Sequence, residues 1–309
     1  MVTMRSRYGL LGGFLAAAVM ALVAPAAQAD LFVGSIASPN TVLQYDETNG
    51  NFIADFGAEI PGGPRGLVWN AGILYVASDS QKAIFTYDSS GNFLGSFATA
   101  PTGGLNGPRG IIFDTAGNLY VACKSSNKVE QYDPNGNYLG DFVAAGSSPL
   151  SGPRGLVFDA SGNLYVASFN TGQVLQYDPS GNFLGVFTQG DNGALSAGIN
   201  GLTFGPDGNL YVTAANAGGI MQYDPNGNFI QPFVLKGNSP LNDPISVLFD
   251  SNGYLYVGDD VAGGVLQFDP QGNYLGYFVD PVLSGPPAIG NAEFMTFTKT
   301  NPVTLQYGP

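Results

Sequence analysis

The feature that most constrains this chain is a repeat of about 45 residues. A glycine, replaced by serine in the last copy, marks the same place in five copies, at spacings of 44, 45, 46 and 45 residues: Gly66, Gly110, Gly155, Gly201 and Ser246. Each copy holds four short apolar runs separated by Asp, Asn, Ser, Pro and Gly, as in residues 152–187 (GPRGLVFDASGNLYVASFNTGQVLQYDPSGNFLGVF). Such runs predict strands joined by tight turns. Four strands in a period of this length are typical of the blades of a β-propeller.

The two ends of the repeat region predict the number of blades. Residues 30–56 begin at the second strand of a unit, and residues 292–299 resemble a first strand with no complete unit after them. We therefore expect these two segments to share one split blade, which closes the ring and removes its exposed edges. The complete blades are expected at about residues 64–97, 108–142, 153–187, 199–233 and 244–278. The predicted fold is all-β, a six-bladed propeller with four antiparallel strands per blade.

The first 29 residues resemble a cleavable signal peptide. Arg5 and Arg7 precede an apolar stretch at residues 10–23, and Ala27-Gln28-Ala29 provides a small-x-small cleavage site. An uncleaved membrane anchor is the alternative, but the apolar stretch is short for a membrane span. We expect export to the periplasm or the medium, no membrane insertion after cleavage, and a single domain at residues 30–309. The last residues, 301–309, have no counterpart in the repeat and are expected to pack loosely or to lie across a blade.

The charge and the missing histidine exclude several functions. The signal segment holds two arginines and no acidic residue, so residues 30–309 carry 8 basic and 23 acidic residues, a net charge of −15. A chain this acidic repels phosphate backbones, which argues against nucleic acid as a partner. The chain has no histidine, which excludes Ser-His-Asp and Cys-His catalysis and most zinc sites. Cys123 is the single cysteine and is expected to be a small buried thiol.

Aspartates recur at two places in the repeat, each followed by a glycine turn. They are Asp46, Asp88, Asp133, Asp178, Asp224 and Asp269 after the third run, and Asp114, Asp159 and Asp250 after the first. A residue type that serves every blade alike is expected to be structural, here by accepting backbone N–H bonds within the turn. Calcium binding by these turns is the alternative.

One position breaks the repeat and points to a site. The residue that precedes the first run, where a propeller strand faces the central channel, is in successive units Arg65, Arg109, Arg154, Asn200, Ile245 and, in the split blade, Glu293. No other arginine follows the signal segment. Three guanidinium groups converging on one mouth of the channel would suit a carboxylate, phosphate or sulfate. The structural alternative is that these arginines bond loop carbonyls or pair with Glu293 and nearby aspartates.

The loops that enter these strands vary in sequence, and variable loops on a rigid scaffold often carry binding sites. Each of five loops contains a leucine that is expected to anchor it by packing: Leu105, Leu150, Leu195, Leu241 and Leu283.

The repeated Pro-Arg-Gly-Leu-Val-Phe-Asp, Gly-Asn-Leu-Tyr-Val-Ala and Val-Leu-Gln-Tyr-Asp-Pro segments resemble the NHL repeat over almost all of residues 30–309. The resemblance implies a six-bladed propeller used as a binding platform. Among enzymes with similar propellers, amidating lyases and streptogramin lyases rely on histidines, which this chain lacks. Gluconolactonase-like propellers hold a divalent metal with Glu, Asn and Asp. Glu293 and Asn200 resemble the first two ligands, and Ile245 stands at the third place.

The leading hypothesis is an exported, monomeric binding module without a cofactor. Its partner would be another protein or a small anionic ligand, held by Arg65, Arg109 and Arg154 and oriented by Asn200 and Glu293. The first alternative is a lactonase or lyase that uses Glu293, Asn200 and a divalent cation such as Ca²⁺. The second is a structural or cell-surface protein without a pocket.

Overall fold

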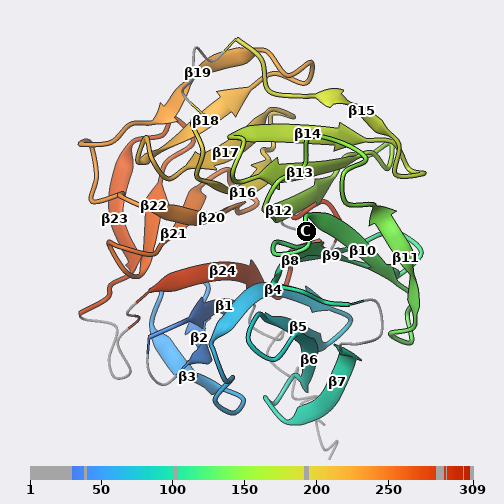
Figure 1. The fold of residues 1–309 in the computed structure, drawn as a ribbon. Coiled ribbons are helices and arrows are strands. Elements are labelled where there is room, and N and C mark those ends of the chain that lie inside the picture. Colours follow the sequence, from blue (N-terminus) through green and yellow to red (C-terminus); the bar gives the residue numbers. More distant parts are fainter. Residues whose placement is uncertain are drawn as a thin grey trace, which may run out of the picture.

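Six four-stranded antiparallel sheets surround a central axis, as the repeat predicts (Figure 1). The computed structural model describes residues 30–37, 40–99, 104–190, 195–282, 289, 291–301 and 303–306. The predicted signal peptide and Leu283 lie outside the described residues. Within the described residues, no helix is long and apolar enough to cross a membrane.

Each blade runs from an inner strand at the axis to an outer strand at the rim. The strands of the five complete blades are β4 (Pro64–Asn70), β5 (Ile73–Ser78), β6 (Ala83–Asp88), β7 (Phe93–Thr99); β8 (Pro108–Phe113), β9 (Leu119–Cys123), β10 (Lys128–Tyr132), β11 (Tyr138–Val143); β12 (Pro153–Phe158), β13 (Leu164–Ser168), β14 (Gln173–Tyr177), β15 (Phe183–Val186); β16 (Ile199–Phe204), β17 (Leu210–Ala214), β18 (Gly219–Tyr223), β19 (Phe229–Val234); and β20 (Pro244–Phe249), β21 (Leu255–Asp259), β22 (Val265–Phe268), β23 (Tyr274–Val279).

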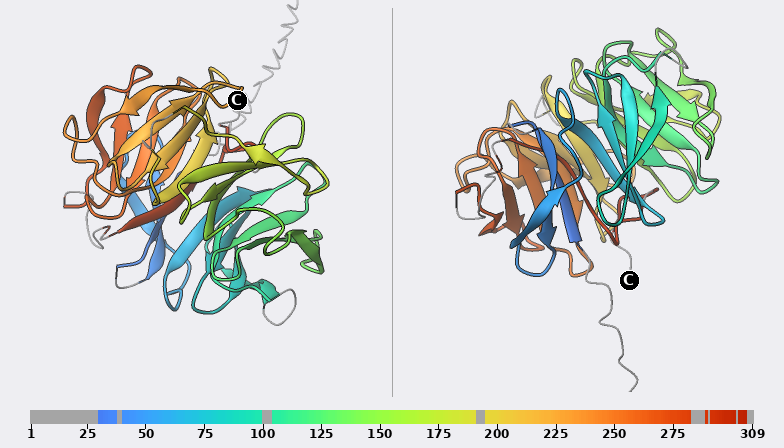
Figure 2. Two further views of the ribbon diagram at one scale, coloured as in Figure 1. Left: turned by 45° about the horizontal axis from the view of Figure 1, so that its top comes forward. Right: turned by 90° about the horizontal axis from the view of Figure 1, so that it is seen from below.

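The split blade closes the ring in the predicted way. Its inner strand is β24 (Ala292–Phe297), which pairs antiparallel with β1 (Asp30–Ser35), followed outward by β2 (Thr41–Asp46) and β3 (Phe52–Phe56). Figure 1 shows this blade between β4–β7 and β20–β23, and the views from other directions agree (Figure 2). The pairing of β24 with β1 covers an inner edge that the N-terminal strands would otherwise expose.

The repeated aspartates are structural, as predicted. In all nine turns the Oδ1 atom of the aspartate accepts the backbone N–H of the residue two positions later, as Asp178 does from Ser180 at 2.9 Å. Gly181 ends that turn with φ 82°, a conformation that glycine adopts without strain. These hydrogen bonds hold the pKa of Asp178 below its usual value, chiefly through the Asn182 side chain.

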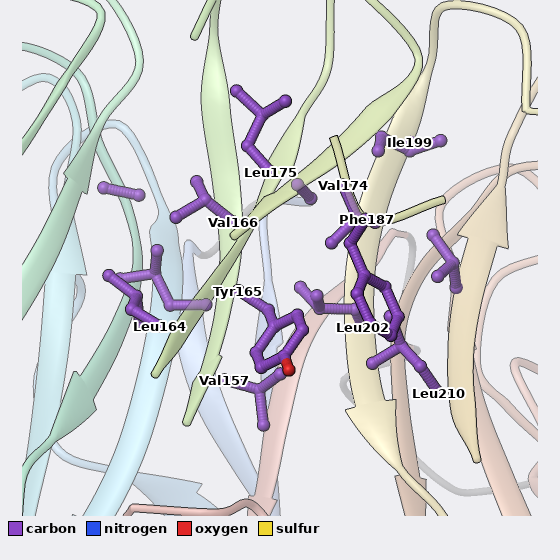
Figure 3. Close-up of a cluster of buried hydrophobic side chains, with 14 of the residues drawn as sticks. Val157, Leu164, Tyr165, Val166, Val174, Leu175, Phe187, Ile199, Leu202 and Leu210 are labelled. Atoms are coloured by element: carbon purple, nitrogen blue, oxygen red, sulfur yellow. The ribbon is translucent and has the colours of Figure 1, made fainter. Parts of the chain in front are cut away.

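Aromatic contacts join each blade to the next. Tyr165 on β13 packs edge-on against Phe187 of its own blade and against Phe204 of the following blade, within a continuous apolar cluster (Figure 3). The corresponding pairs around the ring are Phe32–Trp69, Tyr75–Phe113, Tyr120–Phe158, Tyr211–Phe249 and Tyr256–Phe297. The last pair joins blade five to β24, so the closure rests on the same packing as the other joints.

The loop leucines also pack as predicted. Leu105, Leu150, Leu195 and Leu241 are all buried and belong to the apolar clusters between or within blades. Each therefore fixes the loop that leads into the next inner strand.

The inner strands approach so closely that glycine is required at the repeat's marker position. A Cβ atom at Gly66 would lie 2.0 Å from the carbonyl oxygen of Arg109, and one at Gly110 would lie 2.2 Å from that of Arg154. Ser246 is the exception, and its hydroxyl donates a hydrogen bond of 2.9 Å to the carbonyl oxygen of Glu293. The cavity that remains along the axis has a volume of about 20 Å³, which is room for about one water molecule.

The described part of the C-terminal tail, residues 301 and 303–306, lies against blade three, which is one of the two expected arrangements. It also covers the end of the channel opposite the arginines, which the sequence did not predict. Leu305 lines the axial cavity and packs against the apolar clusters on both sides of the ring. Its backbone amide donates to the carbonyl of Asn301 at 2.9 Å, and the amide of Phe158 donates to the carbonyl of Val303 at 3.4 Å. The sequence could not indicate this because the tail has no counterpart in the repeat.

Candidate ligand site at the channel mouth

The residues that break the repeat come together at one mouth of the channel, each from a different blade. They are the second residues of the inner strands, so each strand begins two residues earlier than the sequence predicts: Arg65 on β4, Arg109 on β8, Arg154 on β12, Asn200 on β16, Ile245 on β20 and Glu293 on β24. In every blade the strand pairing gains one extra residue at this point, which is a β-bulge. Bulges bend a strand and redirect a side chain, and here they recur at the mouth.

Arg65 and Glu293 form an ion pair between neighbouring blades. Glu293 is 5% exposed. Burial raises the pKa of the Glu293 carboxyl, while the positive charges of Arg65 and Arg109 oppose that rise. Pairing with Glu293 is the structural alternative to a ligand site in the sequence analysis, and Arg65 makes this pair.

Arg109 is the most buried of the three arginines, at 8% exposure. Its Nη2 atom donates to Oδ2 of Asp79 at 3.1 Å. Burial, followed by repulsion from Arg65, lowers the pKa of the Arg109 guanidinium, and the carboxylates of Glu293 and Asp79 act in the opposite direction.

Arg154 has no acidic partner among the described residues. It donates to Oδ1 of Asn200, and its guanidinium carbon lies 3.6 Å from the centre of the Phe169 ring, a cation–π contact. Asn200 is fixed in turn, since its Nδ2 donates to the carbonyl of Pro244 at 3.1 Å and its backbone amide donates to Thr213 Oγ1 at 3.1 Å. Burial, then repulsion from Arg109, lowers the pKa of Arg154 to about 10.

The three arginines share an unmet donor. The Nε atoms of Arg65, Arg109 and Arg154 are buried and have no hydrogen-bond partner in the described part of the chain. A guanidinium carries five N–H donors, and a buried donor without an acceptor costs about 1–3 kcal/mol. The described residues therefore leave these three buried donors without an acceptor.

A second set of residues surrounds this ring, and the sequence analysis did not identify it. It consists of the residue that follows the second strand of each blade: Ile36, Asp79, Lys124, Phe169, Ala215 and Asp260. Lys124 lies near enough to Arg109 and Arg154 that their charges, after burial, lower its pKa. The signal was present in the sequence, because this position varies between copies in charge and size.

The donor set does not fit a divalent cation. Oδ1 of Asn200 and Oε1 of Glu293 each accept from an arginine, and the third place holds the apolar Ile245. Metals of this class prefer several carboxylate and carbonyl oxygens. The described residues contain no group of three or more His, Cys, Asp or Glu side chains placed to hold a metal ion.

Cys123 is a buried thiol, as predicted, in blade two. Burial, then the charge of Glu130, raises the pKa of the Cys123 thiol. Glu130 is fully buried, accepts a hydrogen bond from Tyr132 at 2.5 Å and forms an ion pair with Nζ of Lys128 at 2.9 Å. A thiol that resists ionisation is a poor nucleophile, so this cluster is not a second reactive site.

Comparison with known proteins supports the fold. No family model matches the chain, and no curated protein matches it. Among solved structures, a nidogen/laminin complex matches with a TM-score of 0.68 and 19% identity, over 87% of this chain and 98% of that chain. A streptogramin B lyase matches with a TM-score of 0.59 and 19% identity, over 74% and 73%. A putative gluconolactonase matches with a TM-score of 0.57 and 16% identity, over 71% and 78%.

At these identities the likenesses establish architecture and not activity. The folds compared include a component of a protein complex and enzymes, so the same scaffold serves both. The chain is therefore a six-bladed β-propeller, similar in fold to nidogen-type, gluconolactonase-like and streptogramin-lyase-like propellers.

Proposed function

We propose that this protein is an exported binding module that takes an anionic group at the mouth formed by Arg65, Arg109 and Arg154. The observation that supports this most directly is the convergence of three guanidinium groups, from consecutive blades, on one mouth of the channel. Repulsion by Arg109 at Arg154 adds to it, because a bound anion would relieve that repulsion.

The ligand would rest on the mouth and not inside the channel. Below the ring, the axial cavity has a volume of about 20 Å³ and its far end is closed by Leu305. The anion-bearing part of a small molecule, or an acidic side chain of a partner protein, fits this description. The likeness to a propeller in a nidogen/laminin complex is compatible with a protein partner.

The test measures binding of citrate, sulfate and inorganic phosphate to residues 30–309 by thermal melting and by calorimetry. A ligand present at about 100 times its Kd, and bound only by the folded state, raises the free energy of unfolding by about 2.7 kcal/mol. We expect Arg154→Gln to abolish the effect and Lys299→Ala, which removes one positive charge beyond the other end of β24, to retain it. An equal response in wild type and Arg154→Gln would refute the site.

The second candidate, a metal-dependent lactonase or lyase, is favoured by one observation, the placement of Glu293 and Asn200 on the same ring. Its prediction is stabilisation by Ca²⁺ that EDTA reverses and Glu293→Gln removes. Because an arginine bonds each of these oxygens, we expect no such response. A purely structural role, the third candidate, predicts that neither anions nor cations change the melting temperature.

A further inference from the structure

The charged side chains at the mouth are not all paired with a charge of the opposite sign. Two of the four basic side chains, Arg65 and Arg109, form ion pairs with acidic residues. The other two, Arg154 and Lys124, form no ion pair within the described chain, and Arg154 bonds only the neutral Asn200 and Phe169. These two cations come from blades three and two, so one side of the mouth carries positive charge that no ion pair among the described residues compensates.

The opposite side carries uncompensated negative charge. Asp243 directly precedes β20 and Asp260 directly follows β21, so both belong to blade five. The backbone joins them, since the amide of Asp260 donates to the carbonyl of Asp243 at 3.0 Å. The Asp243 carboxylate is half-buried, and the described residues give it neither a hydrogen bond nor an ion pair. Asp260 is bonded by the neutral Asn291 at 2.6 Å.

The two charged groups are separated by a neutral blade. The inner strands follow one another in the order β12, β16 and β20, and the ring residues of β16 and β20 are Asn200 and Ile245. Across this gap, the charge of Asp243 nevertheless acts to raise the pKa of Arg154, and the charge of Arg154 acts to lower the pKa of Asp243. Burial, then the charges of Asp260 and Asp259, raises the pKa of the Asp243 carboxyl, as expected of two carboxylates without a cation between them.

We propose that the ligand at this mouth is a zwitterion, whose anionic group binds at Arg154 and Lys124 and whose cationic group binds at Asp243 and Asp260. This inference rests on the proposed function and narrows it to compounds of the amino-acid class. A ligand that carried only an anion would leave the two aspartates unpaired and would be repelled by them. A ligand with both charges satisfies both sides at once, and its overall neutrality removes repulsion by the net charge of −15 on residues 30–309.

The experiment compares probes that differ only in charge. Calorimetry of residues 30–309 with butyrate, 4-aminobutyrate and butylamine separates the anion, the zwitterion and the cation. Glycine, β-alanine and 6-aminohexanoate vary the distance between the two charges. We expect at least one amino acid of the series to bind about tenfold or more tightly than the carboxylate of matched length, since a charge-assisted bond in a partly buried site contributes about 1.5–3 kcal/mol.

Variants assign the preference to the two aspartates. In the double variant Asp243→Asn, Asp260→Asn, we expect the affinities of the amino acid and of the carboxylate of matched length to differ by no more than about twofold. The carboxylate itself should bind as tightly as in the wild type, or more tightly. Asp55→Asn, which removes an exposed charge on the outer strand β3, should leave the advantage intact. Because the Asp243 side chain has no partner to lose, Asp243→Asn alone should fold and show part of the effect.

The outcomes distinguish this inference from the proposed function. If carboxylates and amino acids bind alike, or if the preference persists in the double variant, the zwitterion assignment is wrong and the anion site stands. If neither butyrate nor phosphate nor any amino acid binds, or if binding is insensitive to Arg154→Gln, both proposals fail.

Discussion

The close approach of the inner strands makes Gly110 a sensitive position. Its substitution by alanine adds a single methyl group. That Cβ atom would lie 2.2 Å from the carbonyl oxygen of Arg154 on the neighbouring blade. An ordinary contact between such atoms is 3.4 Å or more, so the two strands must separate by about 1 Å. Both atoms belong to backbone or are fixed to it, and no rotamer change can relieve the overlap.

We expect Gly110→Ala to lower the free energy of unfolding by about 3 kcal/mol, the upper part of the range for overpacking a well-packed core. For a domain of this size that corresponds to a melting temperature lower by roughly 6–12 °C. Urea unfolding followed by circular dichroism, on residues 30–309, gives the free energy directly. Since the clash moves the backbone of Arg154, binding of anions should weaken as well.

Ser246→Ala is the matched control. It occupies the same place in the repeat, where the chain already accommodates a Cβ atom, and it removes only the hydrogen bond to the carbonyl of Glu293. Its cost should be about 1 kcal/mol. If Gly110→Ala costs no more than Ser246→Ala, the inner strands can separate freely, and the argument that glycine is required at the mouth is wrong.

Three further predictions concern the rest of the fold. Ending the chain at residue 291 removes β24 and exposes the inner edge of β1, so size-exclusion chromatography should show aggregation or dimerisation. Glu130→Ala should cost about 3 kcal/mol, because it leaves a cavity and removes the hydrogen bond from Tyr132 and the ion pair with Lys128. Glu130→Leu, which copies Leu175 of the next blade, should restore at least half of that in the same urea assay. Five of the turn aspartates, Asp88, Asp133, Asp178, Asp224 and Asp269, have pKa values below the usual 3.8. Their stabilisation is therefore present above that pH and is lost as the pH falls through their folded values. The free energy of unfolding should therefore decrease below about pH 3.8, less steeply in Asp178→Asn; an unchanged slope would contradict this assignment.

The architecture could be predicted because the same sequence pattern occurs in five complete copies. Each turn, strand and aspartate recurs in successive copies, so local signals that are ambiguous once become unambiguous when repeated. The split blade followed from the same logic, since residues 30–56 lack a first strand that residues 292–299 supply. The ring of Arg65, Arg109, Arg154, Asn200, Ile245 and Glu293 could be found for the complementary reason, that it interrupts a repeat which is otherwise kept.

Contacts between blades, in contrast, were decided only by the tertiary structure. The sequence places Arg154 and Asn200 in one structural position but cannot say that one bonds the other, because that depends on the bulge and on the distance between neighbouring inner strands. Lys124, Asp243 and Asp260 were also not considered in the sequence analysis, and their charges matter only where blades two and five face one mouth. The tail is the clearest case. Leu305 covers the end of the channel because the inner strands form an apolar surface there, and that surface exists only in the assembled ring.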